Sequence, residues 1–596
     1  MPDRRRPAVA LGSRRWPSGG PVVVAGVVAL LLAVAFLLAP NMGTDLAAQV
    51  ARAHFVDRFG AAPIDLGWYG GINQFGYSLF TAALGATFGV RVVGAVAAVG
   101  SALAFAWLLV AAGARRPLLG ALLGAVVLVG NLVSGRITFA VGLLLGLLAL
   151  CAVAAAGGGS RRLSAANGGR GFGPAAGGGG RGFGPAVAGG GNGSARSARV
   201  GWLVGAGVLA ALGTWASPVA GLFVGLAGGA LLLVNLRRPV RPGPPPRPGA
   251  RRTGRWRPVR WRFGDQLAGA LVLCVAPAVA LAPMALLFGN GGVQPYSFAS
   301  MRTNVVLALV VLVVVPRRWR AVKVGAALTV VLLVGAYYLD SPVGSNALRL
   351  PMLFALPVLA ALADLRWRWL VPLLALAVWW QNPVMVSDLG RAGSTESRAE
   401  FYRPLVDELA RRGPIGRVEV VPLRDHWEST YVAPTVPLAR GWERQVDVDR
   451  NPLFYADRLD PQTYLNWLHL NAVSYVALAP DSVPDRYARN EAALITAGLP
   501  ELREVWRDTT WRLYAVQDPE PLVGAAGRLT GSSPAEVTFV AEAPGEVLVR
   551  VHWSRFLSVT GPGACLRATS DGWTIVRVTT GTYRLGSDLL NPGPHC

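Results

Sequence analysis

The hydrophobic first two-thirds of the sequence contains very few acidic residues. The first glutamate of the chain is Glu396, and only seven aspartates precede residue 387, namely Asp3, Asp45, Asp57, Asp65, Asp265, Asp340 and Asp364. All five histidines lie outside the long apolar runs. Transporters coupled to protons or sodium generally carry acids or histidines inside their helical bundle. This scarcity argues against coupled transport, while it leaves a lipid flippase or a passive channel open.

Lysine is also nearly missing, because Lys323 is the only one in the chain. The formal net charge of +24 therefore comes from arginine, and a balance of this kind is typical of nucleic-acid-binding proteins. The arginines cluster between apolar runs, however, where the positive-inside rule places the cytoplasmic loops of membrane proteins. We therefore expect membrane lipids as partners and no nucleic acid.

Apolar stretches of about 20 residues recur up to about Val386, which predicts an α-helical polytopic membrane protein. We expect about eleven spans, near residues 21–39, 91–114, 116–134, 137–156, 201–216, 218–235, 266–288, 303–316, 321–338, 346–363 and 369–386. Residues 75–89 are too short to cross and are expected to lie along the outer surface. This count places the basic N-terminal tail, residues 1–20, in the cytoplasm and everything after about residue 387 outside the cell membrane.

Composition divides the chain further. Residues 157–199 and 237–264 are rich in Gly, Pro and Arg and are predicted to be disordered cytoplasmic linkers between spans of the 21–386 membrane domain. The remaining 26 of the 33 acids follow residue 387, where no membrane-length apolar run occurs. Mixed helix and strand patterns predict an outer α/β domain at 387–525, and alternating patterns with turn signals predict a β-sandwich-like domain at 526–596.

The four cysteines give no zinc-site spacing. Cys151 and Cys274 fall within predicted spans, where a thiol is usually a small apolar filler. Cys565 and Cys596 lie in the predicted outer region, where oxidation allows a disulfide that would hold the C-terminal tail. The sequence leaves that pairing open.

Three of the seven aspartates, Asp45, Asp57 and Asp65, share one predicted outer loop, residues 39–90. Thr44 can cap a surface helix running to about Phe59, which would present Asp45 at the mouth of the bundle. A carboxylate in that position can activate an acceptor hydroxyl. Further along the loop stand Trp68, Tyr69 and Gln74, residue types suited to stacking on and hydrogen-bonding a sugar ring. Asp57 and Asp65 also fit the simpler interpretation of polar loop residues.

This opening resembles that of GT-C glycosyltransferases, the multi-span enzymes that use polyprenyl-phosphate sugars. One span is followed by a long outer loop, NMGTDLAAQVARAHFVDRFGAAPIDLGWYGGINQFGYSLF, a short apolar segment and the run LGATFGVRVVGAVAAVGSALAFAWLLVAAGARR. The likeness covers about residues 1–160 and is greatest to actinobacterial cell-envelope members, which also carry an outer C-terminal domain. It implies that Asp45 is the catalytic base.

Two departures from the family pattern affect the assignment. Asp45 has no acidic neighbour, and the stretch from Gly71 to Phe75 stands where many members have a His-Pro pair. Asp57 therefore remains an alternative base. No metal site is predicted, although the resemblance allows a divalent cation at Asp45.

A lipid-phosphate donor requires cations at the outer membrane face to bind the phosphate and stabilise it as a leaving group. Arg349, next to Asn346 at the start of the tenth span, is the first candidate, followed by Arg136 and Arg302. Asn346 is a further candidate sugar or acceptor contact. We expect transfer of a sugar from a polyprenyl phosphate to an envelope glycan, glycolipid or protein. The alternatives are a transporter or lipid flippase, and a non-catalytic envelope assembly protein with a glycan-binding outer domain.

Overall fold

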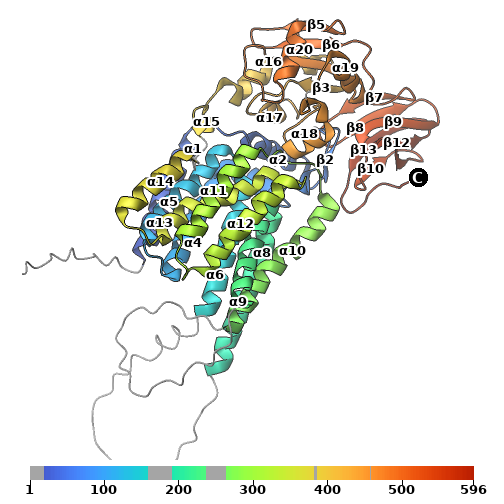
Figure 1. The fold of residues 1–596 in the computed structure, drawn as a ribbon. Helices are drawn as coiled ribbons and strands as arrows, with labels where there is room; N and C mark the ends of the chain where they lie inside the picture. The colour runs from blue at the N-terminus through green and yellow to red at the C-terminus, as the bar shows by residue number, and fades with distance from the viewer. Residues whose placement is uncertain (1–18, 159–190, 237–262, 381–385, 457) are drawn as a thin grey trace, which may run out of the picture.

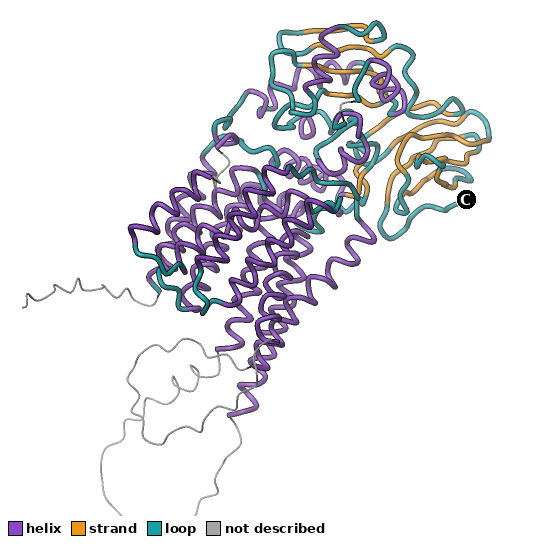
Figure 2. The backbone as a smooth tube through the Cα atoms, viewed as in Figure 1, coloured by secondary structure: helices purple, strands orange, loops and turns teal. Residues whose placement is uncertain are grey.

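The computed structural model describes residues 19–158, 191–236, 263–380, 386–456 and 458–596. A helical bundle carries an α/β part and a β-sandwich above one of its ends (Figures 1 and 2). Most of the predicted N-terminal tail and of the two predicted cytoplasmic linkers, together with residues 381–385 of the last predicted span, lie outside the described residues.

A helix occupies each of the eleven predicted span positions. Within the described ranges, nine helical segments are long and apolar enough to cross a membrane, and two, α11 and α14, are shorter at 17 and 14 residues. The bundle helices are α1 (Gly20–Leu38), α4 (Val90–Ala112), α5 (Pro117–Gly130, continued by the 3₁₀ turn η2, Asn131–Ser134), α6 (Ile137–Gly158), α8 (Gly191–Ala216), α9 (Pro218–Leu236), α10 (Phe263–Phe288), α11 (Phe298–Val314), α12 (Arg320–Tyr338), α13 (Arg349–Leu362, preceded by the 3₁₀ turn η4, Gly344–Leu348) and α14 (Trp367–Trp380).

Small residues allow the helices to pack closely, as is common in membrane bundles. Ala25 and Ala29 of α1 and Ala121 and Ala125 of α5 are fully buried. A Cβ added at Gly124 of α5 would lie only 2.7 Å from the ring of Phe105 on α4. Val and Leu side chains, together with Trp107, cover the outside of the same helices, which gives the bundle an apolar surface suited to lipid.

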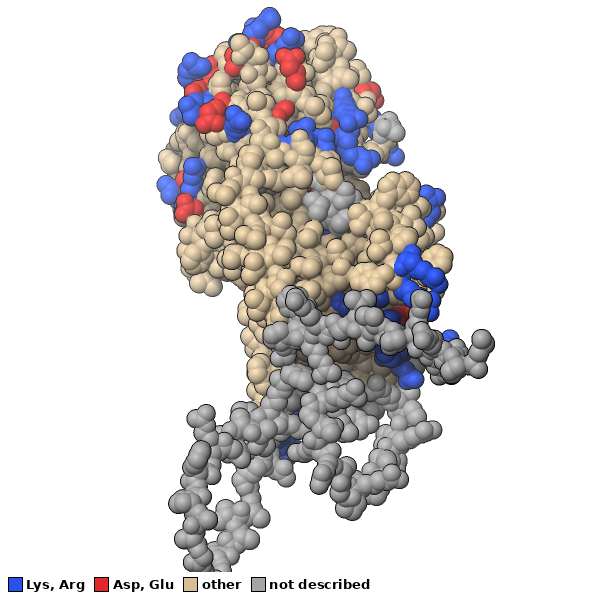
Figure 3. Space-filling model, turned by 90° about the vertical axis from the view of Figure 1, so that its left-hand side faces the viewer, with Lys and Arg blue, Asp and Glu red and all other residues tan. Residues whose placement is uncertain are grey.

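Charged side chains mark the two ends of the bundle. Arg115 after α4 and Arg318 before α12 both form ion pairs with Asp364 after α13. Because α4 and α13 run away from the outer loop, this cluster lies at the end opposite the β-containing parts. In the space-filling view, charged residues of both signs gather over those parts, while much of the bundle surface is uncharged (Figure 3).

The first outer loop folds into short elements against the top of the bundle. It contains α2 (Leu46–Phe59), a two-stranded ribbon of β1 (Ile64–Asp65) and β2 (Ile72–Asn73), and α3 (Thr81–Phe88). The eight residues of α3 span roughly 12 Å, less than half the hydrocarbon core of a bilayer. The segment 75–89 is therefore too short to be a span.

The α/β part has a four-stranded sheet in the order β3-β4-β6-β5, in which β3 and β4 are parallel and the other pairs antiparallel. The strands are β3 (Arg417–Val420), β4 (Val473–Leu478), β5 (Leu502–Arg507) and β6 (Arg512–Val516). The accompanying helices are α15 (Val386–Leu389), α16 (Ala399–Arg411), α17 (Glu428–Tyr431), α18 (Arg444–Arg450), α19 (Pro461–Leu470) and α20 (Arg489–Ala497). An Asp460 and Thr463 capping box begins α19.

The C-terminal part is a β-sandwich whose sheets have the orders β10-β13-β8-β7 and β11-β12-β9. The strands are β7 (Gly527–Ser532), β8 (Val537–Ala541), β9 (Gly545–His552), β10 (Leu557–Thr560), β11 (Cys565–Ala568), β12 (Trp573–Val578) and β13 (Gly581–Ser587). Alternate residues such as Val547, Val549 and Val551 point into its core. Cys565 and Cys596 form a disulfide with an S–S distance of 2.06 Å, which fixes the tail to β11.

Candidate functional site

Asp45 lies at the N-terminal end of α2, directly above the bundle. The helix begins at Leu46, so Asp45 rather than Thr44 occupies the N-cap position, and its side chain caps no backbone group. The Asp45 backbone N–H donates to the Ser134 carbonyl over 3.1 Å. Gly135 makes this contact possible, because its φ is +75° and an added Cβ would lie 2.2 Å from the Leu46 nitrogen. Close packing of the turn at Gly135 against the start of α2 therefore fixes the position of the Asp45 carboxylate.

Two predicted phosphate-binding arginines meet at this carboxylate. Arg136 Nε lies 3.5 Å and Arg349 Nη2 lies 3.8 Å from Asp45 Oδ2. Both distances are within ion-pair range but too long for a good hydrogen bond. The Arg349 side chain is only 8% exposed, and its guanidinium lies 5.1 Å from the centre of the Phe139 ring, so α13 and α6 hold it in place.

Beside these arginines is a small cavity whose lining residues have unused hydrogen-bond donors. Its walls include Asn131, Arg136 and Arg349, and the apolar side chains of Met352 and Leu353. Asn131 Nδ2, Arg136 Nε and Arg349 Nη1 are buried and make no hydrogen bond to any part of the chain that the structure describes. Buried donors are normally paired, so the unpartnered Asn131 Nδ2 and Arg349 Nη1, beside the Arg136 guanidinium that only a long ion pair to Asp45 engages, indicate an anion site.

The sequence analysis missed Asp388, a second carboxyl group at this site. Asp388 belongs to α15, which packs against η2, and it is only 5% exposed. Burial raises the pKa of Asp388, and the neighbouring carboxylate of Asp45 raises it further. Its position was a detectable signal, because it is the first acid after the last predicted span.

The other candidate charges lie elsewhere. Asp57 is exposed on α2, roughly 18 Å along the helix from Asp45. Arg302 is exposed on α11, and no ion pair joins it to another described residue. Asp65 is buried in the loop, where its carboxylate accepts from the Gly67 N–H over 2.8 Å and burial raises its pKa to about 7. None of the three faces the cavity beside Arg349.

The candidate sugar-binding residues Trp68 and Tyr69 do not form an open binding surface. Trp68 and Tyr69 are 1% and 2% exposed, and both contact the outer domain. Trp68 Nε1 donates to the Ser429 carbonyl over 3.3 Å, and the Tyr69 hydroxyl donates to the Gly441 carbonyl over 2.8 Å. Their rings therefore hold the domain on the loop, and their binding of sugar stays a prediction.

The two amide candidates are engaged in local hydrogen bonds. Gln74 Nε2 donates to the Ala62 carbonyl over 2.9 Å, and Asn346 Nδ2 donates to the Pro342 carbonyl over 3.2 Å. Gln74 is buried and Asn346 half-buried. Their roles in binding sugar or acceptor also stay predictions.

Residues of the outer domain fix α2 from above. Trp442 Nε1 donates to the Thr44 carbonyl over 2.6 Å, immediately before Asp45. The Thr430 hydroxyl donates to the Ala47 carbonyl over 2.8 Å. The Trp442 ring is itself stacked on His426 with a centroid distance of 3.4 Å. The outer domain therefore helps to determine the position of Asp45.

The charges around Asp45 do not support the expectation that a divalent cation binds there. No group of three or more His, Cys, Asp or Glu side chains within the described ranges is arranged to hold a metal ion. Two guanidinium groups lie within 4 Å of the Asp45 carboxylate and would repel a divalent cation there.

Neither a protein-family model nor a curated protein sequence matches the chain. Its structure is similar to the Archaeoglobus fulgidus oligosaccharyltransferase tethered to an acceptor peptide (TM-score 0.41, 10% identity, 78% of this chain and 70% of that one). It is also similar to Cupriavidus metallidurans ArnT bound to undecaprenyl phosphate (0.39, 15%, 84% and 98%) and to the mycobacterial arabinofuranosyltransferase AftD (0.43, 13%, 96% and 57%).

Proposed function

We propose that this chain is a membrane glycosyltransferase. It takes a sugar from a polyprenyl-phosphate donor and transfers it to a hydroxyl group of an envelope glycan, glycolipid or protein on the outer face of the cell membrane. One observation carries the proposal: the Asp45 carboxylate lies within 4 Å of Arg136 and Arg349, which line a cavity together with Asn131, and Arg349 Nη1 and Asn131 Nδ2 have no hydrogen-bond partner among the described residues. Glycosyl transfer from a lipid phosphate needs this combination of a base and an anion site.

The donor phosphate occupies the cavity of Arg349. Arg349 Nη1, Arg136 and Asn131 Nδ2 donate to its oxygens, and Met352 and Leu353 form the apolar part of the wall. Fixed cationic donors stabilise the negative charge that grows on a departing phosphate. They are buried, so they exert a stronger field than they would in water.

Asp45 accepts the proton of the acceptor hydroxyl as its oxygen attacks the anomeric carbon. The bond between that carbon and the phosphate oxygen breaks, and the electron pair leaves with the polyprenyl phosphate. Direct displacement of this kind inverts the anomeric centre. Burial raises the pKa of Asp388, so this carboxyl group keeps its proton, and adds no repulsion toward the phosphate, over a wider pH range than an exposed aspartate would.

Binding and turnover of lipid probes test the proposal. Purified protein in lipid nanodiscs should bind undecaprenyl phosphate and should release it from an undecaprenyl-phosphate sugar when an envelope fraction supplies acceptors. A lipid flippase would bind the lipid without releasing the sugar. A non-catalytic assembly protein would do neither, and either result would contradict the proposal.

A further inference from the structure

The turn that follows the last strand carries an unusually exposed apolar side chain. Leu590 is 84% exposed, the highest value for a large apolar residue in the part of the chain that the structure describes. Every other such residue above 60% within those ranges lies on a bundle helix, at the end of α12 or on the surface helix α3, where lipid is expected to cover it. Leu590 therefore has the exposure of a lipid-facing residue, although it belongs to the outer domain.

Contacts place this turn at the outer end of the bundle. The ring of Phe556, between β9 and β10, is stacked on that of Phe288, the last residue of α10, with centroids 5.4 Å apart. The Asp588 N–H donates to the Phe556 carbonyl over 2.9 Å, and Leu590 follows two residues later. The lower edge of the β-sandwich accordingly lies beside the upper end of α10 (Figure 1).

The outer end of α10 lies at the level of the membrane surface. Leu286, in its last turn, is 76% exposed, so lipid is needed almost up to Phe288. Aromatic residues, which favour the membrane–water interface, stand at the neighbouring helix ends. Phe298 begins α11 and Tyr338 ends α12, and both are exposed. Leu590 therefore stands beside the outer boundary of the lipid phase.

Hydrogen bonds hold the turn in a fixed shape. Asp588 Oδ1 accepts from the Leu590 N–H over 2.8 Å and from the Asn591 N–H over 2.9 Å. The Gly593 N–H donates to the Leu557 carbonyl over 3.0 Å. The disulfide of Cys596 to β11 holds the residues that follow. An apolar tip that is already ordered loses little conformational entropy when it binds.

We propose that this turn, residues 588–593, inserts Leu589 and Leu590 into the outer leaflet of the membrane and so supports the β-sandwich on lipid. Both leucines are exposed. Apolar groups at an interface typically enter the leaflet by about 5–10 Å. The inference goes beyond the proposed function, because it does not depend on any sugar transfer.

The size of the tip favours lipid over a protein partner. A typical protein–protein interface buries about 800 Å² on each partner, far more than two leucine side chains supply. Insertion would also bear on the candidate site, because the His552 N–H of the sandwich donates to the Gly70 carbonyl of the first outer loop over 2.8 Å. Lipid contact at Leu590 would thus support the domain that packs on this loop.

Depth-dependent fluorescence quenching tests the inference on the full chain in nanodiscs. The two free cysteines, Cys151 and Cys274, are replaced by alanine, and Leu590→Cys is labelled with an environment-sensitive fluorophore under non-reducing conditions, which keep the disulfide. Lipids with a nitroxide near the headgroup should quench the label by at least about half, and more strongly than lipids with a nitroxide at the chain end, since the insertion is shallow.

Two matched labels calibrate the result. Leu286→Cys, at the outer end of α10, should be quenched as well. Arg507→Cys, on the exposed side of β5 at the top of the α/β part, should not be quenched (Figure 1). Because Leu590 is exposed, its replacement should leave the melting temperature unchanged.

Two outcomes would overturn the inference. A label at 590 that stays unquenched while the label at 286 is quenched would show that the tip remains in water. A blue-shifted label at 590 without quenching by lipid would show that protein covers the tip instead. Neither outcome bears on the glycosyltransferase proposal.

Discussion

Glu443 of the outer domain accepts a hydrogen bond of 2.6 Å from Arg52 of α2, and both side chains are more than 90% buried. The same glutamate accepts from Gln445 over 2.8 Å. This pair ties the outer domain to the helix that carries Asp45, so the two parts form one structural unit.

Removal of Glu443 should loosen this unit. Glu443→Ala leaves a buried guanidinium without its partner, which typically costs about 3–5 kcal/mol. We expect a clear fall in melting temperature, followed by calorimetry or tryptophan fluorescence, together with reduced sugar transfer. Glu504→Ala removes the half-buried partner of the exposed Arg507 and should cost less than about 0.5 kcal/mol. Equal effects of the two substitutions would contradict the role assigned to the buried pair.

Arg349→Ala should weaken the binding of undecaprenyl phosphate by about tenfold to a hundredfold. A lost charge-assisted hydrogen bond to phosphate is worth about 1.5–3 kcal/mol. Arg349→Lys should recover only part, since a point charge replaces a planar fork of donors. The control is Arg302→Ala, at an exposed position remote from the cavity, which should bind the lipid normally. If Arg302→Ala has the larger effect, the phosphate lies elsewhere.

Asp388 predicts how donor binding depends on pH. Its pKa is raised, so the carboxyl group binds a proton over a wider pH range in the folded protein than in the unfolded chain. As pH rises through this pKa, a negative charge appears beside the phosphate site, and the affinity for a sugar phosphodiester should fall. The stability contributed by this group should fall over the same range.

Asp388→Asn should flatten the pH dependence of donor binding, measured at constant salt. A phosphodiester probe keeps one negative charge throughout, so its own titration does not interfere. An Asn variant with the same slope as the wild type would exclude Asp388 as its source.

The disulfide between Cys565 and Cys596 should stabilise the β-sandwich without affecting the site. It closes a loop of 31 residues, for which chain entropy predicts about 3–4 kcal/mol. Cys596→Ser should lower the melting temperature of the outer region and leave lipid binding at Arg349 unchanged. The matched control is Cys274→Ser on α10, where no disulfide is present. A loss of lipid binding in Cys596→Ser would link the tail to the site.

Much of the architecture could be predicted from the sequence, because a bilayer restricts spans to long apolar helices. The grouping of Asp45, Arg136 and Arg349 could also be predicted, because few charged residues lie at the outer ends of the spans. Arg302 also lies at the outer end of a span, however, and it differs from Arg136 and Arg349 only in the helix face that it occupies. Sequence patterns do not specify which way a side chain faces.

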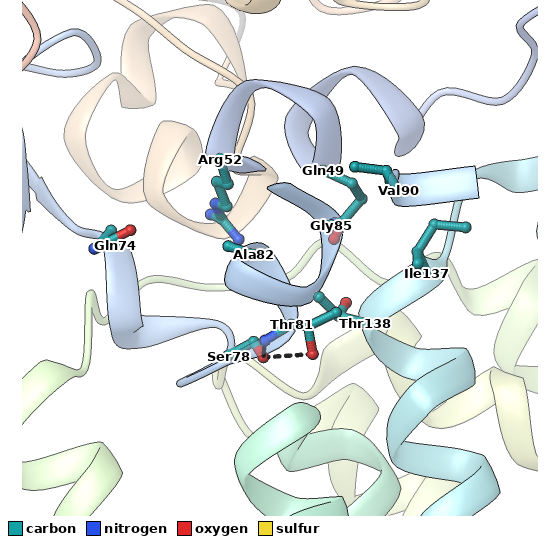
Figure 4. A pocket seen from close by; sticks show the side chains of 10 residues that line it. All are labelled: Gln49, Arg52, Gln74, Ser78, Thr81, Ala82, Gly85, Val90, Ile137 and Thr138. Carbon is teal, nitrogen blue, oxygen red and sulfur yellow. Dashed lines mark hydrogen bonds between the residues drawn. The ribbon is translucent and has the colours of Figure 1, made fainter. Parts of the chain in front are cut away.

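The other differences between the sequence-based predictions and the structure each have a physical cause. Trp68 and Tyr69 have the composition of a sugar platform, but the outer domain covers them, and no local pattern predicts a contact hundreds of residues away. The strands β7, β10 and β13 are hard to recognise in the sequence because Thr, Ser and Gly interrupt their apolar alternation. Gln49 and Thr138 resemble ordinary helix residues in the sequence, and only the fold brings them to one small cavity beneath α2 (Figure 4).

The most direct measurement is sugar transfer by Asp45→Asn beside Asp57→Asn, both in nanodiscs with radiolabelled undecaprenyl-phosphate sugar and an envelope fraction. Asparagine keeps the shape of aspartate but cannot accept the proton, so Asp45→Asn should lose at least about a hundredfold of the transfer rate while it still binds undecaprenyl phosphate. Asp57→Asn should remain fully active. Full activity of Asp45→Asn, with an inactive Asp57→Asn, would contradict the assignment of the base and the site built around it.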